Sequence, residues 1–252
     1  MELGLLVIII FTVFYEPIIG YFGFQRFKSA VREKENARSN YYTYIMVGLW
    51  IPTLFILLLV MFTELEFRQI GIALPTFDAE PLGPFITYTL IAVASLYTLT
   101  LLYYYIAYHL SDSFQEKLTK TKEDQLSNLS YSVILPVSNK EKKRWKSISL
   151  TAGITEEIIY RGTLIFAFTS LFPDQSIWLP ILFSSLLFGL AHTYQGMSGV
   201  IKTAIIGILF SIVYIGLNSI LPLIILHFLI NYTAELGESK PVNVETDSRK
   251  LL

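Results

Sequence analysis

Long apolar stretches alternate with short polar ones along most of the chain. An α-helix needs about 20 apolar residues to cross the hydrocarbon core of a bilayer, which is about 30 Å thick. The pattern therefore predicts an all-α fold, a polytopic membrane helix bundle with about seven transmembrane helices and a range of six to eight. The predicted spans, of which the last is short, are residues 3–22, 41–62, 84–108, 147–172, 176–192, 199–217 and 220–234.

Polar segments divide these spans into four parts. Residues 1–110 form a predicted N-terminal region of three membrane helices, and residues 111–146 a charged cytoplasmic loop. Residues 147–234 hold the remaining spans, and residues 235–252 form a polar C-terminal tail. The first half of the charged loop is either a solvated linker or an amphipathic helix at the membrane surface. Residues 69–75, between the second and third spans, are either an exposed loop or a segment that dips into the interface.

The charges of the loops predict the orientation of the bundle. Cytoplasmic loops carry an excess of Lys and Arg. Residues 109–146 contain eight Lys or Arg, whereas residues 63–83 contain only Arg68 among four acidic side chains. The N-terminus is therefore expected outside and the C-terminal tail inside. The loop at residues 23–40 is basic as well, through Arg26, Lys28, Arg32, Lys34 and Arg38.

The composition favours a membrane protein over a soluble one. Of the 252 residues, 53% are hydrophobic and 15% charged, against about 25% charged in soluble domains. The small size and short loops favour an integral protein of a prokaryotic plasma membrane, with the lipid bilayer as a partner and no nucleic acid. The chain has no cysteine, which excludes disulfides, a thiolate nucleophile and zinc–thiolate sites.

Three ionisable side chains interrupt the span at residues 147–172. A charged residue at the centre of a membrane helix costs about 3 kcal/mol even on lenient scales, so an intramembrane carboxylate pair is a candidate functional site. Glu157 and Arg161 lie four residues apart, with the acid first, which is the favourable order for a helical ion pair. We expect this pair to position the site. Glu156 is then the freer carboxylate and the candidate reactive group.

Two further motifs place polar residues at a similar depth. Phe188 and His192 are four residues apart in the fifth span, and His227 and Asn231 are four apart in the seventh. Residues at this spacing share one face of a helix. Alone, an intramembrane histidine or asparagine is more often a structural partner than a site residue. Because these residues and Glu156 are predicted to lie together on the cytoplasmic side, we interpret them as a functional site.

Two other polar residues receive a structural interpretation. Glu16 precedes Pro17 near the inner end of the first span, where its side chain can reach the membrane interface. We predict that it is structural rather than functional. His109 lies at the cytoplasmic end of the third span and is predicted to be interfacial.

The converging residues suit the hydrolysis of a peptide bond by an activated water. A carboxylate and a histidine that hold a water form a general base, and a second histidine with an amide donor can stabilise an oxyanion. We favour this metal-free mechanism, which requires no cofactor. A Glu with two His is also a zinc ligand set with one open position. Glu156, His192 and His227 are the expected ligands if a divalent metal takes part.

Three motifs follow one another along the chain, one on each of three helices: Glu156-Glu157-x-x-x-Arg161, Phe188-x-x-x-His192 and His227-x-x-x-Asn231. In this order they resemble the CPBP family of CAAX proteases and bacteriocin-processing enzymes, also called Abi. The resemblance covers about residues 147–231. It implies an intramembrane endopeptidase, open to the cytoplasm, that acts on a membrane-associated peptide or protein. It also implies that Glu156 and His192 activate water, and that His227 and Asn231 hold the oxyanion.

Two other functions stay compatible with the sequence. A non-catalytic membrane scaffold or a bacteriocin-immunity factor would keep the same residues for packing. A rhomboid-like serine protease would use Ser198, in the Gly-Met-Ser-Gly segment at 196–199, with His227 as its base. That alternative is minor, because the His-x-x-x-Asn element follows the serine here and precedes it in rhomboids. The absence of Asp from the predicted spans excludes an aspartyl intramembrane protease.

Overall fold

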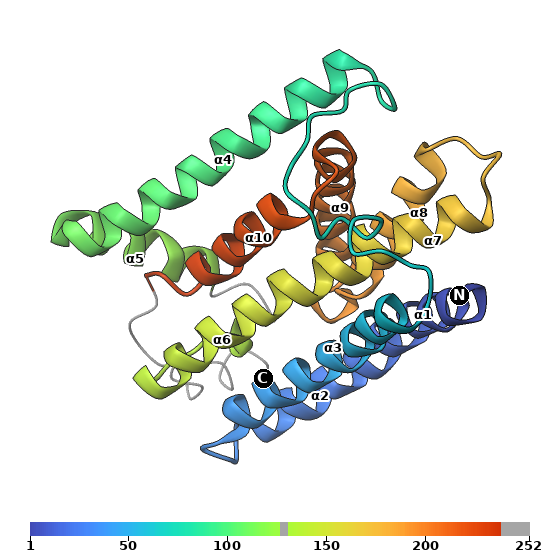
Figure 1. Ribbon diagram of the computed structural model, residues 1–252. Helices are drawn as coiled ribbons and strands as arrows, with labels where there is room; N and C mark the ends of the chain where they lie inside the picture. The colour runs from blue at the N-terminus through green and yellow to red at the C-terminus, as the bar shows by residue number, and fades with distance from the viewer. Residues whose placement is uncertain (127–130, 238–252) are drawn as a thin grey trace.

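The computed structural model describes residues 1–126 and 131–237, which form an all-α fold (Figure 1). Its α-helices are α1 (Glu2–Phe14), α2 (Tyr21–Ala30), α3 (Ala37–Phe62), α4 (Pro84–Leu110), α5 (Asp112–Leu126), α6 (Asn139–Glu156), α7 (Ile165–Leu171), α8 (Trp178–Leu190), α9 (Met197–Leu217) and α10 (Leu221–Thr233). Two π-helical segments, η1 (Tyr15–Gly20) and η3 (Glu157–Leu164), join α1 to α2 and α6 to α7. Two 3₁₀ turns, η2 (Ser132–Ile134) and η4 (Thr193–Gln195), lie in connections.

The helices of the described residues confirm a polytopic membrane bundle. Four apolar helices are long enough to cross a membrane, namely Glu2–Ala30, Ala37–Phe62, Pro84–Leu110 and Met197–Leu217, and α8 and α10 are shorter apolar helices. The fourth predicted span corresponds to the continuous helix formed by α6, η3 and α7. The seven predicted spans are therefore each represented by a helix, in the predicted order.

Two helices extend beyond the apolar pattern. The first span continues from Glu2 to Ala30, through a π-helical turn at Pro17, which lacks the N–H that an α-helix needs at this position. The fourth begins at Asn139 rather than residue 147, because Ser138 and Glu141 form a capping box. Ser138 Oγ accepts from the Glu141 N–H at 3.2 Å, and Glu141 Oε2 accepts from the Ser138 N–H at 3.0 Å.

The segment predicted as a charged loop at 111–146 contains two helical pieces, α5 and the start of α6. In Figure 1, α5 lies near the end of α4, close to α10 and α6. Lys122 of α5 donates to the carbonyl oxygens of Thr233 and Ala234 at 2.9 and 2.8 Å. This part is therefore helical and tied to the end of α10, and its location at the membrane surface stays a prediction.

The loop between α3 and α4 enters the bundle instead of lying on its surface. Ile70 is fully buried, and the Gly71 carbonyl accepts from the Ile220 N–H at 3.0 Å. Gly162, in η3, faces the Ile70 carbonyl oxygen so closely that a Cβ at this position would collide with it. Glycine at 162 therefore lets the loop pack directly on the helix that carries the ionisable residues.

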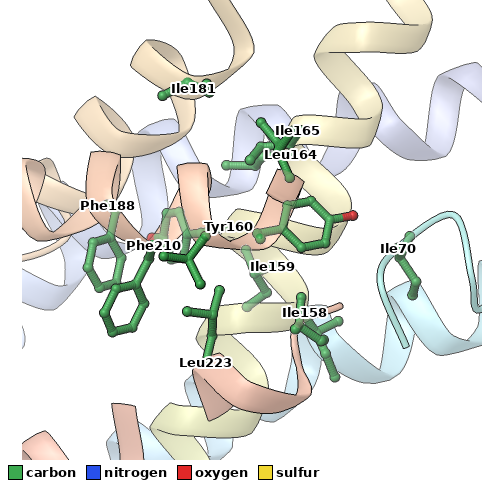
Figure 2. Packing of buried hydrophobic residues seen from close by; sticks show 14 of the residues in the cluster. Ile70, Ile158, Ile159, Tyr160, Leu164, Ile165, Ile181, Phe188, Phe210 and Leu223 are labelled. Atoms are coloured by element: carbon green, nitrogen blue, oxygen red, sulfur yellow. The ribbon is translucent and has the colours of Figure 1, made fainter. Parts of the chain in front are cut away.

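Small residues allow α8 to approach α9, and α6 to approach α10. A Cβ at Gly189 of α8 would lie 2.7 Å from the Val200 carbonyl oxygen of α9, and one at Gly153 of α6 would lie 3.0 Å from the Ile224 carbonyl oxygen of α10. Close helix contacts through small residues are typical of membrane bundles. Figure 2 shows the buried side chains that fill the space around η3, including Ile158, Ile159, Tyr160, Phe188, Phe210 and Leu223.

Candidate active site

The polar residues of the fourth span lie where α6 passes into the π-helical segment η3. The exposed fractions of Glu156, Glu157 and Arg161 are only 8%, 0% and 0%. Short π-helical stretches inside α-helices are rare and often mark functional sites. Within η3 the Thr163 hydroxyl donates to the Ile158 carbonyl oxygen at 2.8 Å, which gives this carbonyl a side-chain partner. The acids are thus carried by a buried and internally bonded helix.

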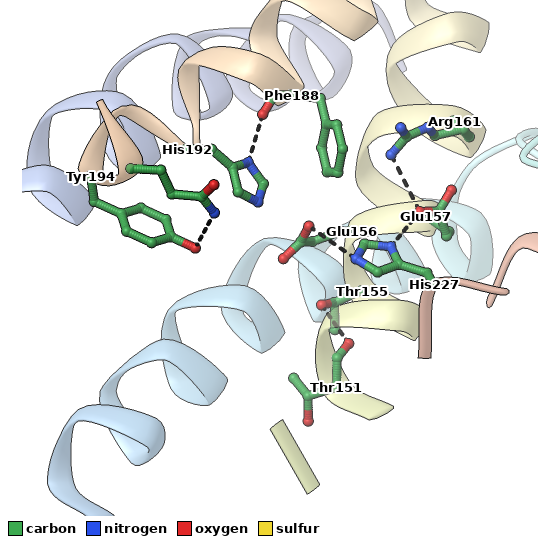
Figure 3. Close-up of polar contacts among 10 residues, drawn as sticks. Thr151, Thr155, Glu156, Glu157, Arg161, Phe188, His192, Tyr194 and His227 are labelled. Carbon is green, nitrogen blue, oxygen red and sulfur yellow. Dashed lines mark hydrogen bonds and ion pairs between the residues drawn. The ribbon is translucent and has the colours of Figure 1, made fainter. Parts of the chain in front are cut away.

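Glu157 contacts two partners through one oxygen atom (Figure 3). Its Oε1 accepts from Arg161 at 3.3 Å and from His227 Nδ1 at 2.7 Å. An ionised carboxylate can only accept, so His227 Nδ1 carries the proton in this bond. The other ring nitrogen, Nε2, then faces Glu156, whose Oε2 lies 3.8 Å away. Glu157 therefore fixes the orientation of the His227 ring and pairs with Arg161.

Two aromatic rings complete the surroundings of Arg161. The centre of its guanidinium lies 4.0 Å from the Phe188 ring centroid and 5.1 Å from that of Phe210. A cation over an aromatic face is attracted by the ring, more strongly when water is excluded. Phe188 also contacts the His192 ring, with 5.0 Å between the ring centroids. Phe188 therefore packs between the buried cation and His192, which lies in the turn after α8.

His192 and Glu156 face the same cavity. His192 Nδ1 lies 2.9 Å from the Phe188 carbonyl oxygen. Since a carbonyl only accepts, this bond places the proton on Nδ1 and leaves Nε2 of the neutral ring as an acceptor. The cavity has a volume of about 90 Å³ and is lined by Glu156, Ala191, His192 and Tyr194 together with residues of η1 and α3. The carboxylate and the ring nitrogen offer polar partners, so a cavity of this size can hold water.

The structure brings together most of the predicted site residues. In Figure 3 the Glu156 carboxylate lies between the rings of His192 and His227. Asn231 is half-buried one turn further along α10, and its backbone oxygen accepts from Trp145 Nε1 at 2.9 Å. Neither His227 nor Asn231 is among the residues that line the cavity. The gathered set is Glu156, Glu157, Arg161, Phe188, His192 and His227.

The gathered donors do not form a ready metal site. Across residues 1–126 and 131–237, no three His, Asp or Glu side chains are grouped as ligands of one ion. Glu157 contacts His227 Nδ1, and the Phe188 carbonyl contacts His192 Nδ1. These bonds leave Nε2 of each ring as the possible ligand atom, so a metal at Glu156, His192 and His227 stays a prediction.

Ser198 is exposed near the start of α9, whereas His227 is buried. The His227 ring nitrogens face Glu157 and Glu156. The geometry that a serine–histidine protease requires is therefore not formed by these two residues.

His109, near the end of α4, is exposed, and its Nδ1 lies 2.9 Å from the Tyr105 carbonyl oxygen.

Glu16 lines the same cavity as Glu156 and His192, although its sequence position had suggested a structural role. The only signal in the sequence was an acid inside an apolar run, directly before Pro17. Glu16 is far from Glu156 along the chain, so the sequence could not predict that they line one cavity. Contact between η1 and the later helices depends on the tertiary fold.

Comparison with known families gives a match over residues 144–233, to the family described as type II CAAX prenyl endopeptidase Rce1-like. The match runs from α6 to the end of α10 and leaves α1–α5 outside. Comparisons with curated proteins and with solved structures gave no significant match. All seven residues of the three motifs fall within the matched region. Residues 144–233 therefore form a domain of the Rce1-like type II CAAX endopeptidase family, within the CPBP/Abi group.

Proposed function

We propose that the protein is an intramembrane endopeptidase that hydrolyses a membrane-associated peptide with a water molecule activated by Glu156 and His192. The observation that carries this proposal is the shared cavity, which both side chains line although one comes from the end of α6 and the other from the turn after α8. The family of residues 144–233 supports a protease. Glu157 and Arg161 are engaged with each other, which leaves Glu156 as the carboxylate of this pair of glutamates that faces the cavity.

In the proposed reaction, water binds between the Glu156 carboxylate and Nε2 of His192. Glu156 accepts one proton of the water while Nε2 of His192 accepts a hydrogen bond from the other, which orients the oxygen. The oxygen attacks the peptide carbonyl carbon and forms a tetrahedral oxyanion. Glu156 then gives its proton to the departing amine nitrogen, the C–N bond breaks, and a carboxylic acid and an amine are released. The reaction needs no covalent intermediate and, as proposed, no cofactor.

His227 and Asn231 are assigned to the oxyanion by the family motif. The 2.7 Å contact with Glu157 holds the His227 ring so that Nε2 is directed toward Glu156. Because Nδ1 already donates to Glu157, Nε2 donates only in the imidazolium form of the ring. In this form it donates toward the reacting carbonyl of a substrate seated beside Glu156. Such donors are worth about 10²–10³ in rate when they meet a developing oxyanion. Asn231 stands on the same face of α10 one turn away.

The proposed orientation has the N-terminus outside, and the C-terminus and the opening of the site on the cytoplasmic side of a prokaryotic plasma membrane. The support is the excess of Lys and Arg at residues 23–40 and 109–146, compared with the acidic loop at 63–83. The substrate is then a membrane-associated peptide or protein that reaches the site from the inner leaflet.

The test compares cells that carry the wild-type protein with cells that carry Glu156→Gln, by proteomics of membrane peptides. We expect one or more peptides to accumulate in the variant, because glutamine keeps the shape of the side chain but cannot accept the proton. Ser198→Ala is the matched control and should process these peptides normally. Normal processing by an inserted Glu156→Gln protein would favour a scaffold or immunity role, and loss of processing in Ser198→Ala would favour a serine protease.

A further inference from the structure

The cavity beside Glu156 contains a second carboxylate from outside the matched domain. Glu16, in η1, lines it together with Glu156 and His192. The Thr193 hydroxyl, directly after His192, donates to the Pro17 carbonyl oxygen at 3.1 Å. This bond ties η1 to the turn that follows His192 and holds Glu16 at a defined place relative to the reactive pair.

Four tyrosines line the same cavity, namely Tyr15, Tyr41, Tyr44 and Tyr194. The rings of Tyr41 and Tyr44 are stacked, with 6.1 Å between their centroids. The Tyr194 ring lies 5.8 Å from that of His192, and its hydroxyl accepts from Gln195 Nε2 at 3.0 Å. Aromatic faces around a carboxylate form a site that attracts cations, as the rings contribute negative potential at their faces.

The two carboxylates of this cavity have no cationic partner among the residues that line it. Its lining residues include Glu16 and Glu156 but no Lys or Arg. Glu16 takes part in none of the ion pairs found among the described residues. Arg161, the buried cation nearest to the acids in sequence, is paired with Glu157. A carboxylate held away from water is costly unless a cation or hydrogen bonds compensate it.

We propose that the cavity is a specificity subsite for a cationic side chain, lysine or arginine, of the substrate peptide close to the scissile bond. This inference rests on the proposed function, because Glu156 and His192 border the subsite. The charged head pairs with Glu16, and the apolar stem packs against the tyrosine rings, Ile45 and Leu49. Membrane proteins carry Lys and Arg at the cytoplasmic flank of their helices, which is where the proposed site opens.

There is free space for such a side chain next to η1. Gly20 lines the cavity, and a Cβ added there would meet no atom within 4 Å. A Gly20→Leu substitution adds an apolar side chain at the wall of the subsite, starting from a Cβ that meets no neighbour. It is expected to weaken the binding of a lysine-containing peptide, and thus to raise KM more than it lowers kcat.

The main experiment uses the full chain in liposomes with synthetic membrane peptides that carry lysine, arginine, norleucine or glutamate at each position around the cleavage site. At one position, we expect kcat/KM for lysine or arginine to exceed that for norleucine by about 10- to 100-fold, as for a buried charged hydrogen bond. In Glu16→Gln this ratio should fall to about one, and Glu16→Lys should shift the preference toward glutamate. Glu2→Gln, an exposed acid of the same helix, should keep the wild-type ratio.

A second measurement does not depend on turnover. N-acetyl-lysine amide should raise the Tm of the purified protein more than N-acetylnorleucine amide does, and this difference should vanish in Glu16→Gln. Equal Tm shifts for the two probes, or equal cleavage of the lysine and norleucine peptides, would overturn the subsite. If this happens while Glu156→Gln still abolishes cleavage, only the subsite fails. Cleavage that survives in Glu156→Gln would instead refute the proposed function. The Tm comparison by itself would then test whether the cavity binds a cationic side chain.

Discussion

Glu156 and Glu157 are neighbours in the sequence but differ in what they contact. Side chains of adjacent helical residues point about 100° apart. Glu157 Oε1 meets both Arg161 and His227, whereas Glu156 borders the cavity and its Oε2 has no hydrogen-bond partner among the described residues. The helix thus directs one carboxylate into the protein and the other toward the space where a substrate can bind.

Burial, rather than distance, should decide how much the ion pairs of this chain contribute to stability. Glu157–Arg161 and Glu116–Lys120 have the same i,i+4 spacing, and the exposed pair is the shorter, at 2.7 against 3.3 Å. Arg161→Met leaves Glu157 buried without its cation, so we expect a loss of about 3–5 kcal/mol in unfolding free energy. Lys120→Met, the matched control, should cause no measurable change. Unfolding of both variants in detergent measures the difference, and equal effects would contradict this account.

Contacts within one helix could be predicted from spacing, because helix geometry fixes them. The Glu157–Arg161 pair and the bond from His192 to the Phe188 carbonyl are both four residues apart. The depth of His192 and His227 in the membrane was predicted from the directions of their helices. The contact of His227 with both glutamates and the position of Glu16 could not be predicted in this way, since they depend on how separate helices pack.

At the scale of elements, the π-helical segments were not predicted. The hydrophobic pattern that identifies a span is the same whether a turn is α-helical or π-helical. Pro17 gives a local reason for η1, because it removes a backbone donor. Nothing in the sequence of η3 gives a comparable reason. The burial of the loop around Ile70 was left open by the sequence, and its packing on Gly162 explains why that helix position has no side chain.

Gly162→Ala tests the contact between η3 and the buried loop. The added Cβ would collide with the Ile70 carbonyl oxygen, so the loop or the helix must shift. We expect a loss of about 1–3 kcal/mol, typical of overpacking, and a lower Tm. Gly20→Ala is the matched control for stability, because Gly20 also lies in a π-helical segment and its Cβ would meet no atom within 4 Å. A Tm for Gly162→Ala as high as that of Gly20→Ala would show that the contact is looser than described.

At the scale of the whole molecule, the apolar pattern predicted the helices well because a bilayer requires long apolar segments. The arrangement of those helices depends on packing that the pattern does not contain. In Figure 1, α1–α3 lie together along one side of α6, while α4 stands apart across the molecule. The cavity is therefore formed jointly by the N-terminal segments η1 and α3 and by the matched domain, although the family match begins only at residue 144.

The absence of cysteine makes the orientation of the chain easy to measure. A single cysteine placed at the exposed positions Glu33, Glu80 or Lys117 provides one labelling site each. We expect a membrane-impermeant maleimide to label Glu80→Cys in intact cells, and to label Glu33→Cys and Lys117→Cys only after permeabilisation. The reverse pattern would place the basic loops and the opening of the site outside.

The most direct test of the account is a double-mutant cycle on Glu156 and His192, measured as kcat for a cleaved peptide in liposomes. If the two side chains act on one water, Glu156→Gln and His192→Ala should each lower kcat by about 10²–10⁴-fold. The double variant should then lose no more than the worse single variant, because either loss disables the same step. Losses that multiply in the double variant, or near wild-type turnover in either single variant, would contradict the shared activation of water.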